Sequence, residues 1–134
     1  MNEQTLFIIK PNAVAAGATD AILKQINNDG FVVAKTKTLR MTRQLAEEFY
    51  AEHRGKPFYE QLIEFMTSGD VVVGVAERND AIKEMRRLVG ATDPAEAAEG
   101  TVRKLYGIDR TKNAIHASDS PQSAEREQSI LFGR

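Results

Sequence analysis

The sequence Thr5-Leu-Phe-Ile-Ile9 is a continuous apolar run rich in β-forming residues. It predicts a strand that is buried on both faces at the centre of a sheet. The run ends at Lys10-Pro11, because proline disfavours helical geometry at the preceding lysine and cannot continue a central strand. Lys10 is either a snorkelling side chain at a strand end or a cation fixed at the edge of a cleft. On its own, this position favours the first interpretation.

Strands and helices alternate along the rest of the chain. Val71-Val-Val-Gly-Val75 predicts a second buried strand, and residues 31–39 predict a strand with one solvated face. Thr19-Asp20 and Thr42 are expected to cap helices, and a further helix is expected from Pro57. The expected order is β, α, β, α, α, β, α, loop, β, α. This order favours an α/β or α+β sandwich in which helices cover a small mixed sheet, with a split βαβ, ferredoxin-like layout as the natural candidate.

Residues 101–112, TVRKLYGIDRTK, show no sustained periodicity and carry four basic residues. They predict a loop that is long for a compact domain, and such loops are often functional. Ala114-Ile115 then predicts a short strand that leads into His116. Ser120 and Pro121 are expected to start the last helix.

Length and composition restrict the class of protein. The 134 residues suit a single domain over positions 1–134, and the absence of cysteine excludes disulfides and thiol chemistry. A formal net charge of −1 argues against a dedicated nucleic-acid binder, so no obligatory nucleic acid is expected. The first apolar run is too short for a signal sequence or a membrane span, so we expect no membrane contact and a cytoplasmic location.

The sequence Asn113-Ala-Ile-His-Ala-Ser-Asp-Ser120 holds one of only two histidines. His116 could be a nucleophile, a general base, a metal ligand or a filler. It closes a short strand beside the predicted loop, and the polar side chains of Asn113 and Ser118 lie within a few residues of it. These features favour a catalytic histidine over a structural one.

Glu127 is expected to face the core, because it shares one helical face with Ile130 and Leu131. A buried carboxylate normally needs a partner. If it accepts from one nitrogen of His116, the other nitrogen keeps its lone pair and can act as a nucleophile. In the alternative interpretation, Glu127 lies at the edge of the apolar stripe and pairs with a cation such as Arg126.

Several cations are expected near a cleft: Lys10 at a strand end, Arg86 or Arg87 at a helix end, and Arg103 and Arg110 in the loop. Phosphoryl transfer needs such a clamp, because negative charge is spread over the phosphoryl oxygens. Each cation alone is an ordinary solvated residue, but together with a histidine they suggest phosphate. The chain has no glycine-rich phosphate loop, so phosphates would be bound by side chains.

Metal binding by protein ligands is not expected. The two histidines are far apart and lack the spacing of a zinc site. Mg²⁺ that is carried mainly by substrate phosphates would leave little trace in the sequence.

The chain resembles nucleoside diphosphate kinases along essentially its full length. The strongest match is the segment 113–120, which is similar to the family signature N-x-x-H-[GA]-S-D. Further motifs match in order and spacing: Ile8-Ile-Lys-Pro-Asn-Ala-Val14, Phe49-Tyr50, Lys56-Pro-Phe58, Gly90-Ala-Thr-Asp-Pro94 and Ser123-Ala-Glu-Arg-Glu127.

The resemblance implies a role for each matching residue. His116 is the phosphorylated nucleophile, and Arg86 is preferred to Arg87 because it lies six residues before Thr92, as in the family. The resemblance also implies phosphate contacts by Lys10, Arg86, Thr92 and Arg103, base stacking by Phe58 and ribose contact by Asn113. It implies that Tyr50, Ser118 and Glu127 lie beside the histidine and that Glu127 orients the ring.

The resemblance also implies a fold and an assembly. We expect an α/β sandwich with a ferredoxin-like βαββαβ core, in which helices cover a four-stranded antiparallel sheet. We also expect Mg²⁺ as cofactor and a homo-oligomer, tetramer or hexamer, built from dimers. Two positions depart from the family: residues 104–107 read Lys-Leu-Tyr-Gly instead of Gly-Asp-Phe-Gly, and Ala117 stands where Gly is commoner. In the family, the loop that contains residues 104–107 borders the nucleotide cleft and contributes to subunit contacts.

The function implied is a ping-pong phosphotransfer. A nucleoside triphosphate would give its γ-phosphoryl group to His116, and a nucleoside diphosphate would then accept it. Two alternatives are a catalytically weak interaction or nucleic-acid-binding module on the same fold and a histidine phosphatase. Joint presence of the histidine, the cations and Glu127 argues against the first.

Overall fold

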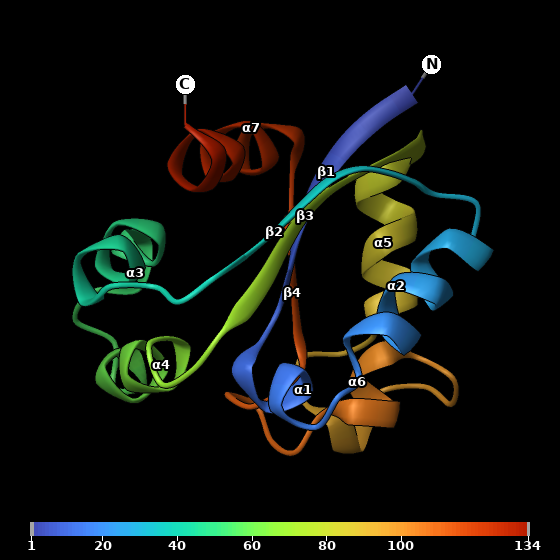
Figure 1. Ribbon diagram of the computed structural model, residues 1–134. Coiled ribbons are helices and arrows are strands. Elements are labelled where there is room, and N and C mark those ends of the chain that lie inside the picture. The colour runs from blue at the N-terminus through green and yellow to red at the C-terminus, as the bar shows by residue number, and fades with distance from the viewer. Residues whose placement is uncertain (1, 134) are drawn as a thin grey trace.

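The computed structural model describes residues 2–133 and contains one four-stranded sheet of order β2-β3-β1-β4 (Figure 1). The strands are β1 (Asn2–Ile9), β2 (Val32–Leu39), β3 (Val71–Asn79) and β4 (Ile115–Ala117). All three strand pairs are antiparallel. The antiparallel sheet that the family resemblance implies is confirmed, and the mixed sheet expected from the element order was wrong. The reason is that β3 lies between β1 and β2 and separates the two strands that would run parallel.

The apolar run of residues 5–9 lies in a central strand, as predicted. Leu6 and Ile8 point to one face of the sheet and Phe7 and Ile9 to the other, and all four side chains are fully buried. A strand that contributes to two cores must be apolar on both faces. Gly74 of β3 pairs with Phe7 of β1, and a Cβ on Gly74 would lie 2.3 Å from the Phe7 ring. The glycine therefore makes room for the ring.

Helices cover both faces of the sheet, as Figure 1 shows. On one face, α7 packs with α3 and α4 over Leu6 and Ile8; on the other, α2, α5 and α6 pack over Phe7 and Ile9, with α1 beside them. No helix between residues 2 and 133 is long and apolar enough to cross a membrane. The helices are α1 (Pro11–Ala15), α2 (Thr19–Asn28), α3 (Arg43–Phe49), α4 (Tyr59–Met66), α5 (Ala81–Val89), α6 (Val102–Tyr106) and α7 (Pro121–Phe132), with 3-10 turns at Ala51–His53 and Pro94–Glu96.

The ends of several elements differ from the sequence predictions. Thr42 caps α3, since its side chain accepts from the Leu45 N–H at 3.1 Å, but the cap expected at Thr19-Asp20 was wrong. Both residues lie inside α2, whose N-cap is Ala18. Pro11 ends the strand as expected and also starts the short helix α1, which apolar periodicity could not reveal in five residues.

The predicted loop at 101–112 contains a helix. Residues 102–106 form α6, because the Thr101 side chain accepts from the backbone N–H of Lys104 and caps the turn. Five residues are too few to show a helical period. Two departures from the family pattern, Lys104 and Leu105, are exposed on its outer side, while Arg103 points inward. Tyr106 is half-buried against the core.

Candidate active site

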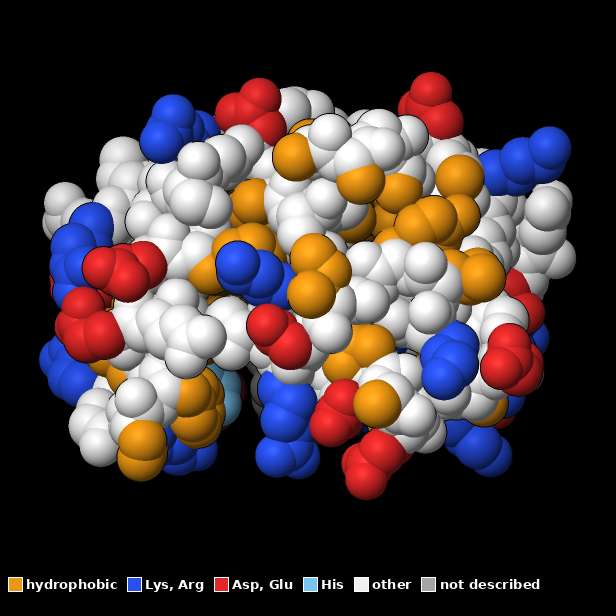
Figure 2. Space-filling model, turned by 90° about the horizontal axis from the view of Figure 1, so that it is seen from below, with side chains coloured by type: hydrophobic (Ala, Val, Ile, Leu, Met, Phe, Trp, Pro, Cys, Tyr) orange, Lys and Arg blue, Asp and Glu red, His pale blue; other side chains and the backbone are white. Residues whose placement is uncertain are grey.

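A cavity of about 690 Å³ opens between the residues around α3 and α4 and the segments around residues 90–113. In Figure 2 a histidine lies in a recess beside lysine or arginine side chains. Nine of the ten predicted site residues line the cavity, although they come from six separate parts of the chain. These nine are Lys10, Tyr50, Phe58, Arg86, Thr92, Arg103, Asn113, His116 and Glu127.

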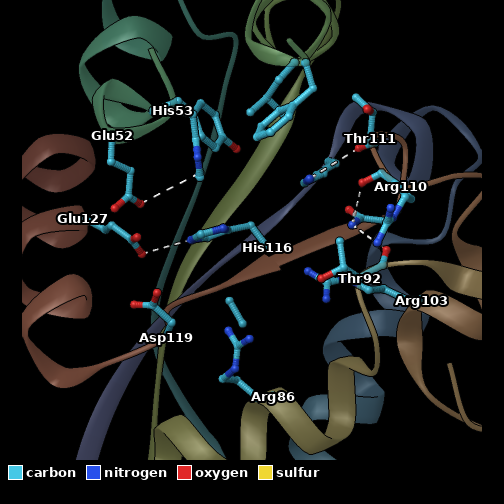
Figure 3. Close-up of a pocket in the computed structure, with 16 residues that line it drawn as sticks. Glu52, His53, Arg86, Thr92, Arg103, Arg110, Thr111, His116, Asp119 and Glu127 are labelled. Atoms are coloured by element: carbon cyan, nitrogen blue, oxygen red, sulfur yellow. Dashed lines mark hydrogen bonds and ion pairs between the residues drawn. The ribbon is translucent and has the colours of Figure 1, made fainter. Parts of the chain in front are cut away.

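The tenth residue, Ser118, is fully buried and does not line the cavity, but it contacts the carboxylate of Glu127, which does. His116 Nε2 is 3.0 Å from Glu127 Oε1 (Figure 3). The Ser118 hydroxyl donates to the same oxygen at 2.7 Å. Glu127 is only 5% exposed and projects from α7 toward the sheet, which is the direction that its helical face predicts. A carboxylate at this distance accepts the Nε2–H, so in the neutral ring Nδ1 keeps its lone pair. No residue between 2 and 133 hydrogen-bonds to Nδ1, which leaves it available to a ligand.

The position of His116 follows from strand pairing. It pairs with Ile8 of β1, and its ring packs edge-on against Phe49, with ring centroids 5.2 Å apart. Ala114, just before β4, has φ = 79°, a left-handed conformation that is strained for a residue with a Cβ. Its carbonyl accepts from the Lys10 backbone N–H at 2.7 Å, so the strained turn is tied to the end of β1.

Lys10 follows the end of β1, where it is buried and lines the cavity instead of snorkelling into solvent. Its side chain is 6% exposed, and Nζ donates to the Thr111 carbonyl at 3.4 Å. Burial, with a further contribution from the Arg103 charge, lowers the pKa of Lys10 to about 7. A lysine in this state gains much from an anion beside it.

Arg103 is held by backbone carbonyls. Its guanidinium donates to Ile115 O at 2.9 and 3.3 Å and to Gly90 O at 3.0 Å. Burial and then the charge of Arg86 lower its pKa to about 10. The two arginines are therefore close enough to repel each other, as expected for a site that awaits an anion.

The adjacent arginines of α5 have different surroundings. Arg86 lines the cavity, whereas Arg87 lies on the surface and pairs with Glu84 at 2.9 Å and Asp29 at 3.0 Å. The structure therefore brings Arg86, and not its neighbour, to the candidate site, in agreement with the choice made from spacing to Thr92.

Asn113 and Tyr50 are buried polar residues of the cavity wall. Asn113 Nδ2 donates to Thr92 O at 3.0 Å and Arg110 O at 3.1 Å, while its Oδ1 has no partner within residues 2–133. The Tyr50 ring lies 6.5 Å from His116, and its hydroxyl is also unpaired. Burial and the Glu127 charge raise the pKa of Tyr50, so the hydroxyl stays protonated and can donate.

Sequence reasoning missed further residues of the cavity wall. His53 received no role from the sequence, but it lines the cavity, and burial lowers its pKa. Its ring lies 5.4 Å from Phe58, whose side chain is 42% exposed. Asp119 belongs to the histidine motif yet received no role; a hydrogen bond from Ser123 lowers its pKa, so it is ionised. Both residues could have been identified from their places in the sequence, since Asp119 follows Ser118 and His53 lies between two matched motifs.

Carboxylates are sparse in the cavity. Within residues 2–133, no group of three or more His, Cys, Asp or Glu side chains could hold a metal ion. Besides Glu127, only Glu52 and Asp119 among the acidic residues line the cavity.

Known proteins of one kind match the chain. The sequence model of the family described as nucleoside diphosphate kinase matches residues 3–134. A nucleoside diphosphate kinase of Archaeoglobus fulgidus is 48% identical over 130 residues, which are 97% of this chain and 86% of that protein. One of Sorangium cellulosum is 46% identical over 130 residues, covering 97% of this chain and 90% of that protein.

Solved structures match equally well. The Aquifex aeolicus nucleoside diphosphate kinase superimposes with a TM-score of 0.96 at 46% identity, covering 98% of this chain and 96% of that one. A nucleoside diphosphate kinase of Halobacterium salinarum, solved in complex with CDP, gives a TM-score of 0.96 at 39% identity and covers 100% of this chain and 90% of that one.

Proposed function

The chain belongs to the nucleoside diphosphate kinase family, and we propose that His116 carries the phosphoryl group between its nucleotides. The chain is a phosphotransferase that moves the γ-phosphoryl group of a nucleoside triphosphate to a nucleoside diphosphate. One observation carries the assignment to this histidine. Glu127 occupies Nε2 at 3.0 Å, which leaves the Nδ1 lone pair in a cavity lined by four cations, Lys10, Arg86, Arg103 and Arg110.

In the first half-reaction, Nδ1 of His116 attacks the γ-phosphorus. The new N–P bond forms as the bond to the β–γ bridging oxygen breaks, and the nucleoside diphosphate leaves. The ring becomes positively charged as it donates its lone pair, and the Glu127 carboxylate at Nε2–H stabilises that charge. In the second half-reaction, a β-phosphate oxygen of another nucleoside diphosphate attacks the same phosphorus, the N–P bond breaks, and Nδ1 regains its lone pair.

The cations are the residues that bind the transferring phosphates. Lys10, Arg86 and Arg103 all line the cavity with His116, and their mutual repulsion is relieved when phosphate oxygens lie between them. Thr92 adds a hydroxyl on the same wall. Tyr50 donates a hydrogen bond beside the histidine, because its pKa is raised and its hydroxyl has no other partner.

The remaining residues bind the nucleoside. Asn113 offers its unpaired Oδ1 to a ribose hydroxyl. Phe58 offers an exposed ring on which a base stacks, and stacking tolerates any base. This arrangement explains acceptance of several nucleotides, since ribose and phosphates would set the position.

Mg²⁺ is the metal that we propose for the reaction, bound mainly by the substrate phosphates. The donor set fits this, because Asp119 and Glu52 can accept hydrogen bonds from water on an ion but are too few to hold it alone. Such an ion neutralises phosphate charge and orients the triphosphate.

The assembly and the domain assignment are also proposals. We propose a homo-oligomer, tetramer or hexamer, built from dimers, and one kinase domain over residues 1–134. The family match over residues 3–134 supports the single domain. Solution mass by light scattering would separate tetramer from hexamer. The cytoplasmic location stays a prediction from the sequence.

Labelling with γ-³²P-ATP tests the histidine. We expect the protein to gain an acid-labile, alkali-stable label, which His116→Ala abolishes. The chain has one other histidine, so His53→Gln is the matched control and should keep the label at saturating ATP. A label that survives in His116→Ala, or none in the wild type, would overturn the proposal.

A chase with nucleoside diphosphate distinguishes a kinase from a phosphatase. Unlabelled GDP should discharge the labelled protein into labelled GTP. A phosphatase would instead release inorganic phosphate without any acceptor. The non-enzymatic alternative predicts no label at all, and the comparisons do not favour it.

A further inference from the structure

Arg126 directly precedes Glu127, and the mechanism described above gives it no role. The sequence left open that Glu127 pairs with this arginine. In the structure the two side chains leave α7 in different directions. Glu127 turns to His116, whereas the Arg126 guanidinium donates to the backbone carbonyls of Glu48 at 2.7 Å and Phe49 at 3.3 Å. Within residues 2–133 it forms no ion pair, so its charge is committed to backbone oxygens of another helix.

The two carbonyls lie at the C-terminal end of α3. Phe49 is the last residue of this helix, and no basic residue of α3 lies in its last turn. Carbonyls at a helix end lack helical partners and carry partial negative charge, so a cation is favoured beside them. Figure 1 shows α3 and α7 on the same side of the sheet. Arg126 therefore supplies from α7 the cation that α3 lacks.

Phe49 connects this contact to the reacting ring. Its side chain is 2% exposed, and its ring lies edge-on to His116, with the ring centroids 5.2 Å apart. It also packs edge-on against Tyr50 at 4.8 Å. The backbone that Arg126 holds is thus the backbone from which the aromatic neighbour of the imidazole projects.

Two consecutive residues of α7 therefore act on the imidazole from different directions. Glu127 bonds Nε2 at 3.0 Å and determines which nitrogen carries the proton. A single hydrogen bond leaves the ring free to tilt about that contact, and the edge-on packing of Phe49 restricts the tilt. Attack of Nδ1 on phosphorus requires that the lone pair point in one defined direction.

We propose that Arg126 is a positioning residue, which holds the end of α3 so that Phe49 packs against His116 and Nδ1 points toward the phosphorus. This proposal rests on the function proposed above, because it concerns the same histidine. Arg126 does not line the cavity, so it acts on the reaction only through α3.

Single-turnover labelling with saturating γ-³²P-ATP compares the wild type, Arg126→Met and Arg126→Lys. We expect Arg126→Met to slow phosphorylation of His116 by roughly 5- to 20-fold, because a misdirected nucleophile reacts more slowly. Arg126→Lys should recover part of the rate, since an ammonium can bond one carbonyl but lacks the fork of a guanidinium. Nucleotide affinity, measured by calorimetry, should change little.

Proton NMR of the free protein measures the aromatic contact without any chemistry. The ring current of Phe49 shifts the imidazole proton signals of His116. The chain has only two histidines, so His53→Gln identifies those signals. We expect them to move toward the positions of an unfolded peptide in Arg126→Met and to return part of the way in Arg126→Lys. An arginine that only stabilised the fold would leave them in place.

Arg40→Met is the matched control. Arg40 is also an exposed arginine that donates to a carbonyl at a helix end, Thr67 O of α4 at 3.3 Å, but neither residue lines the cavity. This variant should keep the wild-type labelling rate and the wild-type His116 signals. Equal slowing in Arg40→Met and Arg126→Met would attribute the effect to a general loss of helix packing and overturn the proposal.

Two further outcomes would also overturn it: Arg126→Met that labels at the wild-type rate, and slow labelling with the His116 signals in place. Absence of label in the wild type would instead refute the proposed function. In that case the NMR comparison alone decides whether Arg126 holds the ring contact.

Discussion

The imidazole of His116 has one nitrogen engaged and one free, and this asymmetry is set by a single carboxylate. The inward direction of Glu127 was predictable, because residues at i, i+3 and i+4 share a helical face and two of them are apolar. The sequence could not show which ring nitrogen would meet the carboxylate. That depends on how α7 crosses β4, and the structure gives Nε2 at 3.0 Å.

We predict that Glu127→Gln slows phosphorylation of His116 by roughly 10- to 100-fold, the cost of replacing a charged hydrogen-bond acceptor by a neutral one. The Gln oxygen can still accept from Nε2–H, so the ring stays in place. It cannot stabilise the positive charge that develops on the ring. Single-turnover labelling gives the rate, and calorimetry should show nucleotide affinity little changed.

Glu125→Gln is the control for this change, because Glu125 is an exposed carboxylate on the same helix and does not line the cavity. Its labelling rate should equal that of the wild type. If Glu127→Gln also labelled at the wild-type rate, the carboxylate would have no role beyond packing.

At the scale of elements, residues 101–112 show where sequence patterns are insufficient. This segment has no period, so a loop was predicted, and the helix α6 that presents Arg103 was missed. The capping signal at Thr101 was present in the sequence, but a threonine before a basic stretch is not specific. By contrast, the buried strands were predictable, because the apolar runs 5–9 and 71–75 cover more than half of β1 and of β3.

The clamp residues were assigned by resemblance, and patterns alone could not gather them. Lys10, Arg86 and Arg103 are distant in sequence and meet only through the antiparallel pairing of β1 with β4 and the packing of α5 and α6 on that edge. Long-range pairing of this kind leaves no local periodic signal.

Gly90 ends α5 beside Thr101, the cap of α6, and we predict that Gly90→Ala disrupts this contact. Gly90 has φ = 93°, and a Cβ there would lie 2.6 Å from the Thr101 hydroxyl oxygen, while its carbonyl accepts from Arg103. The strained backbone costs on the order of 1–3 kcal/mol of unfolding free energy, and the steric clash adds to it. Urea unfolding should show the loss, and nucleotide affinity should fall as Arg103 is displaced.

Gly17→Ala separates backbone strain from the clash. Gly17 also has positive φ, 77°, but a Cβ there would meet nothing within 4 Å. It should lose only about 1–2 kcal/mol of unfolding free energy and keep its nucleotide affinity. Equal effects of the two substitutions on affinity would contradict the proposed dependence of Arg103 on Gly90.

For the whole molecule, the site carries a cost in stability. The fold buries Lys10 at the end of its central strand, where burial and Arg103 lower the pKa from 10.5 to about 7. A group whose pKa is depressed on folding in this way opposes folding while it is charged. A phosphate group bound beside Lys10 would offset this loss of stability, and such losses are common in functional sites.

We therefore predict that Lys10→Met stabilises the free protein while it abolishes efficient phosphotransfer. Below pH 7 the lysine is charged in both folded and unfolded chains, and the penalty is at its full value, with an upper bound of roughly 5 kcal/mol at 1.36 kcal/mol per pKa unit. Between pH 7 and 10.5 the unfolded chain holds a proton that the folded chain lacks, so wild-type stability rises with pH. The advantage of Lys10→Met should be largest at pH 6 and disappear near pH 10.5.

Urea unfolding at pH 6, 8 and 10 measures this trend, with both variants compared with the wild type at each pH. Lys24→Met is the matched control, because it makes the same substitution at an exposed lysine. Its effect on the free energy of unfolding should be small and independent of pH. A Lys10→Met advantage that stayed constant from pH 6 to pH 10 would mean that the folded protein leaves the lysine pKa at its ordinary value. In that case the cation would not be primed by burial, and its affinity for phosphate would have to come from geometry alone.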